Sequence, residues 1–378
     1  MIARRDFLGI ACTAVAGLGF AAIDRTAIQF LGRRVVYPRP LRPGDTIGIT
    51  SPSAGIGPSL EPRLQFCLKK LRDLGYAIRE GRCLRSEKIV SAPASVRAKE
   101  LRDMLLDPSI AAIMPPWGGE LLIDILPLLD FDMLARATPK WIVGYSDLCT
   151  LMLPFTLCTH IATLHGSNLL EAPIDPTDEA LAYWNDVLRL CPGETFIQHA
   201  ASLYQDEDVD WVKTPYATSF NRTKPVKWKC LKHENKPDYF VRASGRLIGG
   251  TLDVIGMLVG TQYGKLDAFV RACAPEGLIL YFDNCDFNTA QYARMLHHLK
   301  LAGWFCHANA ILIGRTAGEQ LREFTQRDAL VDALADVNVP ILYDVDVGHL
   351  PPQLILVNGA LASITFGPNV RSISQTLG

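Results

Sequence analysis

From Gly44 onward, the sequence alternates short apolar runs with stretches in which apolar residues recur at helical spacing. The run at 110–114 is continuously apolar, as expected for a strand that is buried on both faces. A glycine-containing turn at 115–120 follows directly and leads into the helical spacing of 122–129. This alternation is typical of βα units, so the sequence predicts a mostly parallel βα domain that contains a strand-turn-helix elbow.

Length and pattern together predict two domains. The chain has 378 residues, whereas single cores stop growing at roughly 250–300 residues. Between about 192 and 242 the periodicity fades into polar, proline-broken sequence. We therefore predict an N-terminal α/β domain at 42–190, an irregular linker at 191–242 and a C-terminal α/β domain at 243–378. Strands are expected at 46–50, 76–80, 110–114, 141–145, 161–165, 245–250, 277–283, 310–314, 340–345 and 354–357, and helices at 60–74, 95–106, 252–259, 289–301 and 327–335.

The charge balance excludes one class of partner. Lysine and arginine total 38 against 39 aspartate and glutamate residues, which leaves a formal net charge of −1. Such a chain has no surplus positive field with which to hold a polyanion. We therefore expect no nucleic-acid partner.

The N-terminus has the outline of a twin-arginine export signal, because Arg4 and Arg5 precede a mostly apolar run at 9–23. About 15 apolar residues are few for a membrane span, which needs about 20. The sequence thus predicts a signal at 1–30, a periplasmic or other extracytoplasmic location, and no stable membrane span after signal removal. A retained membrane anchor or an ordinary first helix is the alternative. Loss of Cys12 with the signal would leave nine widely spaced cysteines, so no disulfide framework is expected.

The cysteine and histidine pattern offers little support for a metal site. Cys230 and His233 form a lone Cys-x-x-His pair with no second pair at zinc spacing. His297 and His298 are adjacent and would point to different sides of a helix. We predict neither a metal nor a cofactor.

Seven short motifs occur in an order and at spacings that resemble the LD-carboxypeptidase and microcin-immunity family of serine peptidases. The similarity extends over roughly 42–366, which is nearly the whole chain after the signal. The motifs are 44–49 (GDTIGI), 118–119 (GG), 126–132 (LPLLDFD), 144–147 (GYSD), 165–166 (HG), 249–252 (GGTL) and 348–349 (GH).

The resemblance implies a Ser-His-Glu triad in a cleft between the N-terminal and C-terminal domains. The family histidine maps to His349, and the family glutamate maps to Asp283, which is one methylene shorter. We assign the family serine to the third position after the glycine pair, where this chain has Leu122. Gly118 and Gly119 would form the turn whose backbone N–H groups stabilise an oxyanion. The chain is therefore expected to be a divergent member that lacks the motif serine.

Each assigned residue also has a structural interpretation. His349 could be a structural histidine in a Gly-His-Leu-Pro-Pro turn, and Asp283 could cap the end of a strand. If both are functional, the carboxylate fixes the imidazole tautomer and the free ring nitrogen could activate water.

Three residues are candidates to replace the missing serine. Ser146 begins a predicted helix, and in our interpretation the family keeps this serine without using it as a nucleophile, so helix capping is expected. Cys285 would share a face with Asp283 if the strand continued, although a buried inert thiol is the favoured interpretation. Glu120, at a helix N-terminus, could act as a general base or simply complement the helix dipole.

These observations leave three functional hypotheses. The first is an exported hydrolase that releases the terminal D-alanine from a murein tetrapeptide, and the second is an inactive family member that binds muropeptides or peptides. The third is a hydrolase that detoxifies a peptidyl-nucleotide antibiotic, in which Trp117 could stack on a base. In each case the expected partner is a small peptide-like ligand, and the choice between monomer and homodimer stays open.

Overall fold

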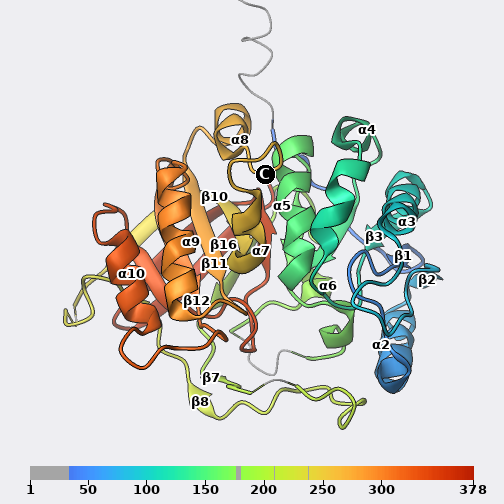
Figure 1. Cartoon of the computed structure of the whole chain (residues 1–378), viewed down its shortest axis with the longest axis horizontal. Helices are drawn as coiled ribbons and strands as arrows, with labels where there is room; N and C mark the ends of the chain where they lie inside the picture. Colours follow the sequence, from blue (N-terminus) through green and yellow to red (C-terminus); the bar gives the residue numbers. More distant parts are fainter. Residues whose placement is uncertain (1–33, 176–179, 208, 237) are drawn as a thin grey trace, which may run out of the picture.

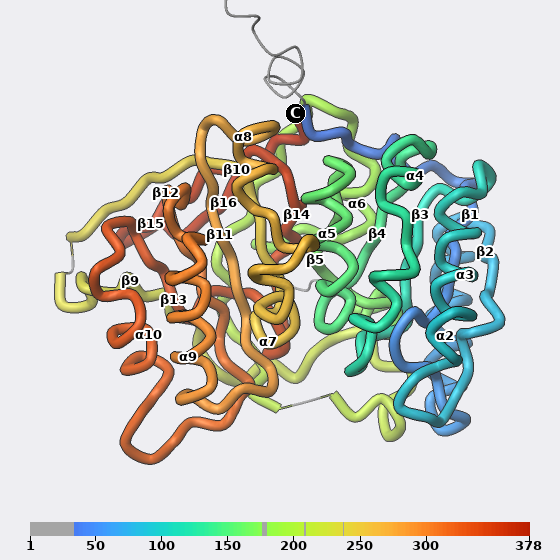
Figure 2. The backbone as a smooth tube through the Cα atoms, turned by 45° about the horizontal axis from the view of Figure 1, so that its top comes forward, coloured from blue at the N-terminus to red at the C-terminus, as the bar shows by residue number. Residues whose placement is uncertain are grey.

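The computed structural model describes residues 34–175, 180–207, 209–236 and 238–378. The predicted signal at 1–30 lies outside the described residues. Two sheets stand side by side, each with helices packed against it (Figures 1 and 2). Within the described residues, no helix has both the length and the apolar character that a bilayer crossing requires. None of the nine cysteines in this part of the chain forms a disulfide.

The first sheet is built by the N-terminal lobe. In the described residues its strand order is β14-β5-β4-β3-β1-β2, and the strands from β5 to β2 are parallel. The predicted βα alternation of this lobe is thereby confirmed. Its strands are β1 (Thr46–Ile49), β2 (Ala77–Glu80), β3 (Ile110–Ile113), β4 (Trp141–Gly144) and β5 (Thr163–His165). Its helices include α2 (Glu61–Asp73), α3 (Ala94–Leu106), α4 (Phe131–Ala135), α5 (Cys149–Thr159) and α6 (Trp184–Val187).

The second sheet belongs to the C-terminal lobe. In the described residues its order is β6-β16-β15-β10-β11-β12-β13-β9, with a parallel centre from β10 to β13 and antiparallel flanks. Its central strands are β10 (Val241–Thr251), β11 (Leu278–Asp283), β12 (Ala308–Gly314) and β13 (Ile341–Val345). Its helices are α7 (Leu252–Ile255), α8 (Leu266–Cys273), α9 (Thr289–Leu301) and α10 (Gln326–Leu334).

Segments distant in sequence tie the two lobes together. β14 (Leu356–Asn358) comes from the C-terminal part of the chain but pairs with β5 in the first sheet. The region expected to be an irregular linker contributes β6 (Thr195–His199) and β9 (Lys229–Cys230) to opposite edges of the second sheet. Such edge strands escape a search for apolar runs because half or more of their residues face solvent. The same region holds the ribbon of β7 (Leu203–Tyr204) and β8 (Lys224–Pro225), and β15 (Leu361–Gly367) and β16 (Val370–Thr376) complete the second sheet.

A buried ion pair fixes the loop that follows β13. Arg315, just after β12, donates from Nη1 to Asp346 Oδ1 at 2.6 Å, and both side chains are buried. Its Nη2 donates to the carbonyl oxygens of Leu350 and Pro352, at 2.8 Å and 3.0 Å. Removing one partner of such a pair would leave an uncompensated buried charge, so the arrangement holds the chain immediately after His349 in one position.

Candidate active site

Ser146 occupies a strained elbow between a strand and a helix. β4 ends at Gly144, and a 3-10 turn that begins at Ser146 leads directly into α5. Ser146 has a φ of 66°, a left-handed conformation that is unfavourable for a residue with a side chain. Tyr145, not Ser146, is the N-cap of this turn, so the expected role of Ser146 as a helix cap is wrong. A strained strand-to-helix turn of this kind exposes the hydroxyl of a nucleophilic serine in many hydrolases.

Asp147 locks this elbow to the surrounding loops. Its buried carboxylate accepts hydrogen bonds from the Ser53 hydroxyl at 2.5 Å and the Leu122 backbone N–H at 2.9 Å. The other carboxylate oxygen accepts from the Thr150 hydroxyl at 3.0 Å. Because two other segments and the first turn of α5 all donate to one carboxylate, the strained backbone at Ser146 is held in place.

Leu122 does not stand at an elbow. It opens a 3-10 helix (Leu122–Leu128), and its side chain is fully buried in the core. Eight residues separate it from the end of β3, so the tight strand-turn-helix expected there is absent from this part of the described chain. The glycine pair instead packs against the real elbow. A Cβ on Gly118 would lie 2.9 Å from Ser146 Oγ, and Gly119 has a φ of +143°.

The two glycines leave backbone donors free near Ser146. Within the described chain, the N–H groups of Gly118 and Gly119 make no hydrogen bond. Only a residue without a side chain fits between Ser146 and Ser53, since a Cβ on Gly119 would lie 2.4 Å from Ser53 Oγ. The turn can therefore present N–H groups to a negative oxygen formed beside the serine.

His349 and Asp283 form the buried pair that the sequence suggested. His349 Nδ1 lies 2.7 Å from Asp283 Oδ2, which is fully buried at the end of β11. Burial alone would lower the pKa of His349, but the Asp283 carboxylate outweighs it and holds that pKa well above its usual value. Burial would likewise raise the pKa of Asp283, and the imidazole lowers it instead. Each partner therefore favours the charged form of the other.

The second ring nitrogen of His349 is free. Nε2 makes no hydrogen bond to a described residue, but the atom itself is buried, although 15% of the whole side chain is exposed. The Cys285 thiol beside the ring also contributes to raising the pKa of His349. The ring of Tyr145 lies 4.9 Å from the imidazole ring, centroid to centroid, and the Tyr145 hydroxyl donates to Glu171 at 2.6 Å. An imidazole oriented by a carboxylate and free at Nε2 can serve as a general base.

One hollow between the lobes brings Ser146, the glycine turn and His349 together. It has a volume of about 440 Å³, and its walls combine the Ser146 elbow, the glycine turn and His349. The remaining lining residues come from both lobes and from the segment between β7 and β8. They are Ala54, Ile89, Trp117, Glu120, Tyr145, Asn168, Leu170, Glu171, Trp211, Cys285 and Asp286.

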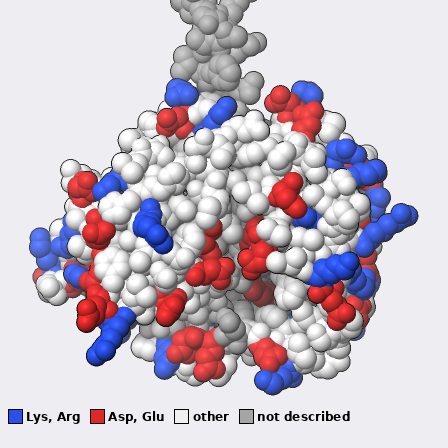
Figure 3. All heavy atoms as spheres, in the orientation of Figure 1, with Lys and Arg blue, Asp and Glu red and all other residues white. Residues whose placement is uncertain are grey.

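The hollow is acidic. Glu120, Glu171 and Asp286 line it, and none of its described lining residues is lysine or arginine. Figure 3 shows acidic groups on both sides of the depression near the centre of that face. Burial, then the charges of Asp286 and Asp147, raise the pKa of Glu120. An ammonium group of a ligand would meet complementary charge here.

Two further residues that the sequence singled out, Cys285 and Trp117, also line this hollow. Cys285 is next to His349, as its predicted position near Asp283 implied, but burial raises the pKa of its thiol. A thiol with a raised pKa is a poor source of thiolate, the reactive form. Trp117 uses its indole N–H to donate to Ala54 O at 3.2 Å, which fixes the start of the glycine turn.

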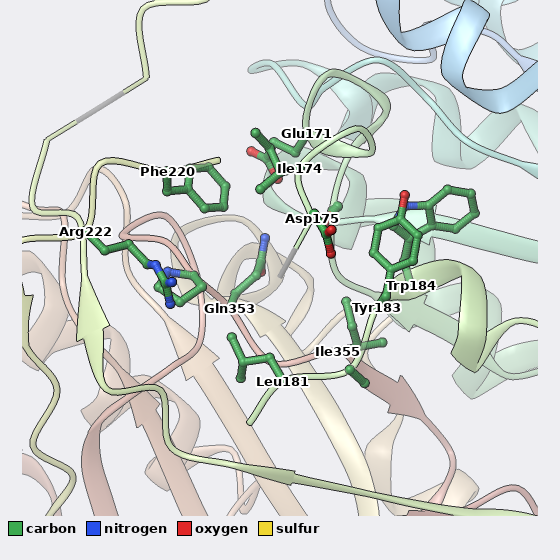
Figure 4. Close-up of a pocket in the computed structure, with 13 residues that line it drawn as sticks. Glu171, Ile174, Asp175, Leu181, Tyr183, Trp184, Phe220, Arg222, Gln353 and Ile355 are labelled. Carbon is green, nitrogen blue, oxygen red and sulfur yellow. The ribbon is translucent and has the colours of Figure 1, made fainter. Parts of the chain in front are cut away.

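A second hollow adjoins the first across Glu171, which lines both. Figure 4 shows that side chains from both lobes reach into it, among them Tyr183, Trp184 and Gln353. Gln353 follows His349 by four residues, so one loop serves both hollows.

Our sequence interpretation missed Tyr145, Glu171 and Trp211. Tyr145 stands inside the quoted GYSD motif, and its neighbour Ser146 was the signal that could have found it. Glu171 ends a single-turn 3-10 helix and Trp211 lies outside the strands and helices, so neither segment has a periodicity that predicts it, and only the fold brings both residues to the site. Cys230 and His233 are apart from it, with His233 stacked on Tyr239 at 3.8 Å between ring centroids. In the described ranges, no group of three or more histidine, cysteine, aspartate or glutamate side chains is arranged to hold a metal ion.

Comparisons with known proteins agree with this architecture. A family model described as the LD-carboxypeptidase N-terminal domain matches residues 47–166, and the LD-carboxypeptidase C-terminal domain matches 244–364. A Vibrio cholerae protein with a carboxypeptidase name is 29% identical over 344 residues, covering 88% of this chain and 96% of that protein. A Bacillus subtilis protein named for murein peptide carboxypeptidase activity is 23% identical over 332 residues, covering 86% and 91%.

A solved structure matches the fold over nearly its full length. It is an active-site mutant of the microcin C7 self-immunity protein MccF, with a TM-score of 0.74 at 22% identity. The match covers 90% of this chain and 98% of that one. In that mutant a serine, an asparagine and a lysine are replaced by alanine.

Gly348 is the residue that lets the loop bearing His349 approach Asp283. It has a φ of +97°, and a Cβ there would lie 2.3 Å from Asp283 Cβ. We expect Gly348→Ala to lower the free energy of unfolding by about 1–3 kcal/mol more than Gly260→Ala. Gly260 is the matched control, because it has a φ of +84° with nothing within 4 Å of the added Cβ. Urea unfolding of both variants measures the difference.

The same substitution should also change the titration of His349. If Asp283 is pushed away, the pKa of His349 falls toward or below its usual value of about 6.5, which NMR titration of the imidazole would detect. Equal stability of the two variants together with an unchanged His349 titration would contradict this account of Gly348.

Proposed function

Because the chain belongs to the LD-carboxypeptidase family, we propose that it is an active serine peptidase that removes the terminal D-alanine from murein-derived tetrapeptides. The observation that carries the proposal is the strained Ser146 elbow, which lines the same hollow as the unpartnered Nε2 of His349. The murein-peptide name of the Bacillus subtilis relative supports the substrate class.

The chemistry follows from these groups in two steps. Ser146 Oγ attacks the carbonyl carbon of the scissile amide, and His349 Nε2 takes the hydroxyl proton. Asp283 holds the Nδ1–H tautomer and stabilises the imidazolium. His349 then gives the proton to the departing amine of D-alanine, leaving an ester on Ser146. Water, deprotonated by His349, attacks that ester and regenerates the serine.

Backbone N–H groups supply the oxyanion stabilisation. In strand-to-helix elbows, the residue after the nucleophile provides one donor and a neighbouring loop provides another. Here these are Asp147 and the Gly118-Gly119 turn, whose amides make no other hydrogen bond in the described chain. Removing one such donor typically reduces kcat by about 10²–10³.

The inactive-binder hypothesis depended on a lost serine, and the geometry weakens it. Leu122 lies in the core rather than at an elbow, and the shorter Asp283 still reaches His349 at 2.7 Å. Glu120 is left with an electrostatic role, because its carboxylate is exposed at the rim and Ser146 already occupies the nucleophile's position.

The first test is release of D-alanine from a murein tetrapeptide. We expect turnover by the parent protein and a loss on the order of 10⁴–10⁶ in kcat for Ser146→Ala and for His349→Ala. Ser109→Ala, an exposed serine remote from the hollow, is the matched control and should retain full activity. A coupled D-alanine assay measures all four proteins.

Two outcomes would contradict the proposal. Full activity of Ser146→Ala would exclude this nucleophile, and a gain of activity only on Leu122→Ser would restore the lost-serine hypothesis. Cleavage of an aminoacyl nucleotide in place of the tetrapeptide would assign the protein to the antibiotic-detoxifying branch.

The buried pair predicts the pH profile. His349 accepts a proton only when neutral, and Asp283 raises its pKa, so kcat/KM should increase with pH along a limb centred above about pH 6.5. Asp283→Asn removes the opposing charge and leaves burial, which lowers the pKa. The limb should then move to lower pH while kcat falls by about 10⁴, as in other triads that lose this carboxylate. If the pH limb of kcat/KM does not move in Asp283→Asn, Asp283 is not the carboxylate that sets the pKa of His349.

We further propose that the protein is exported by the twin-arginine route, with Arg4 and Arg5 as the recognised pair. Changing both to lysine should retain the protein in the cytoplasm, because this route requires the arginine pair itself. Fractionation of cells that express either form provides the measurement. Unaltered export of the double variant would exclude the route, and recovery of the parent in the membrane fraction would favour a retained anchor.

A further inference from the structure

One wall of the active-site hollow is held by a buried arginine that takes no part in the chemistry. Leu170, Glu171 and Trp211 form this wall; the first two belong to a short 3-10 helix (Leu169–Glu171), and Trp211 belongs to the segment between β7 and β8. The segment between β7 and β8 runs along the foot of the molecule toward α2 (Figure 1). Arg63, in the first turn of α2, is 0% exposed and lies where these segments meet.

Arg63 contacts both segments at once. Its Nε donates to the carbonyl oxygen of Leu170 at 2.8 Å. Its Nη1 donates to the carbonyl oxygens of Ala217 at 2.6 Å and Pro215 at 3.1 Å. One planar guanidinium therefore joins the Leu170 segment to the segment that follows Trp211, a geometry that a lysine ammonium cannot reproduce.

The same guanidinium lies against Trp211. Its central carbon is 3.9 Å from the centroid of the indole ring, well within the distance of a cation–π contact. Nearby, Phe66 of α2 packs edge-on against Tyr216, with ring centroids 5.6 Å apart. Together these contacts fix the segment 211–217 against α2 and determine where the indole stands at the hollow.

Burying the Arg63 guanidinium carries a free-energy cost that stability alone does not explain. Burial lowers the pKa of Arg63, and Nη2 has no hydrogen-bond partner in the described chain. A buried cation without a directly paired carboxylate carries a desolvation penalty of several kcal/mol. An apolar side chain of similar volume would fill the space without that penalty, so a role beyond packing is indicated.

We infer that Arg63 is a positioning residue that preshapes the substrate-binding wall formed by Leu170, Glu171 and Trp211. That the ligand is a murein peptide rests on the proposed function, whereas the positioning itself does not. A wall ordered in advance lowers the entropy cost of binding, so its loss should weaken binding while leaving Ser146, His349 and Asp283 in place.

The wall can be tested without a substrate. In Arg63→Lys, amide hydrogen exchange across 210–217 should become faster, while exchange in α9, in the other lobe, stays unchanged. Arg72→Lys is the matched control, since Arg72 lies on the same helix with 51% of its side chain exposed. Unchanged exchange across 210–217 in a folded Arg63→Lys protein would overturn the inference.

Binding and turnover provide the second readout. In a Ser146→Ala background, calorimetry with a murein tetrapeptide should give a Kd about tenfold higher for Arg63→Lys than for Arg72→Lys, or 1.4 kcal/mol. In the active protein, KM should rise by a similar factor with kcat changed less than about twofold. If Arg63→Lys does not fold, Trp211→Leu is the alternative variant. It removes the indole ring from the wall at a partly exposed position, and it should raise KM in the same way.

The outcomes separate the two proposals. A parent protein that neither binds nor cleaves the tetrapeptide refutes the proposed substrate, while the exchange experiment still decides the role of Arg63. A parent that cleaves the tetrapeptide, with Kd and KM unaffected by Arg63→Lys and by Trp211→Leu, refutes the positioning role alone.

Discussion

The contact between His349 and Asp283 is the interaction on which the site depends. A fully buried carboxylate at the end of β11 is tolerable only with a charged or hydrogen-bonding partner, and the imidazole 2.7 Å away provides one. Gly348 permits that approach because a side chain there would overlap Asp283. The ion pair between Arg315 and Asp346 holds the following loop, so the orientation of Nε2 is determined before any ligand arrives.

The two halves of the site come from different lobes, and the chain crosses between the lobes more than once. Ser146 follows β4 in the first sheet, and His349 follows β13 in the second. β14 then returns to pair with β5 of the first sheet, only seven residues after His349. Parallel strands present their following loops at one edge, which is why residues 203 positions apart can line a common hollow.

The sequence predicted most of the regular structure in physical terms. Runs such as 110–114 and 278–283 are buried strands, and the apolar spacing of α2, ended by Gly75, is an amphipathic helix. The pair of His349 and Asp283 followed from the family resemblance. The elbow expected at the glycine pair was wrong, because an elbow is defined by a backbone torsion and by the length of a turn. Neither the φ of Ser146 nor the eight residues between β3 and Leu122 can be read from spacing to a glycine pair.

What the sequence by itself determined was the family, the βα architecture and the chemistry available at His349, Asp283 and Ser146, since periodicity and residue type are local properties. The tertiary structure alone decided which of these side chains meet. It placed Leu122 in the core and Ser146 at the hollow beside the glycine turn, and it brought Glu171 and Trp211 to the wall that Arg63 holds. Those outcomes depend on long-range packing and on the pairing of buried charges with groups that are distant in the chain. No short segment of sequence contains that information.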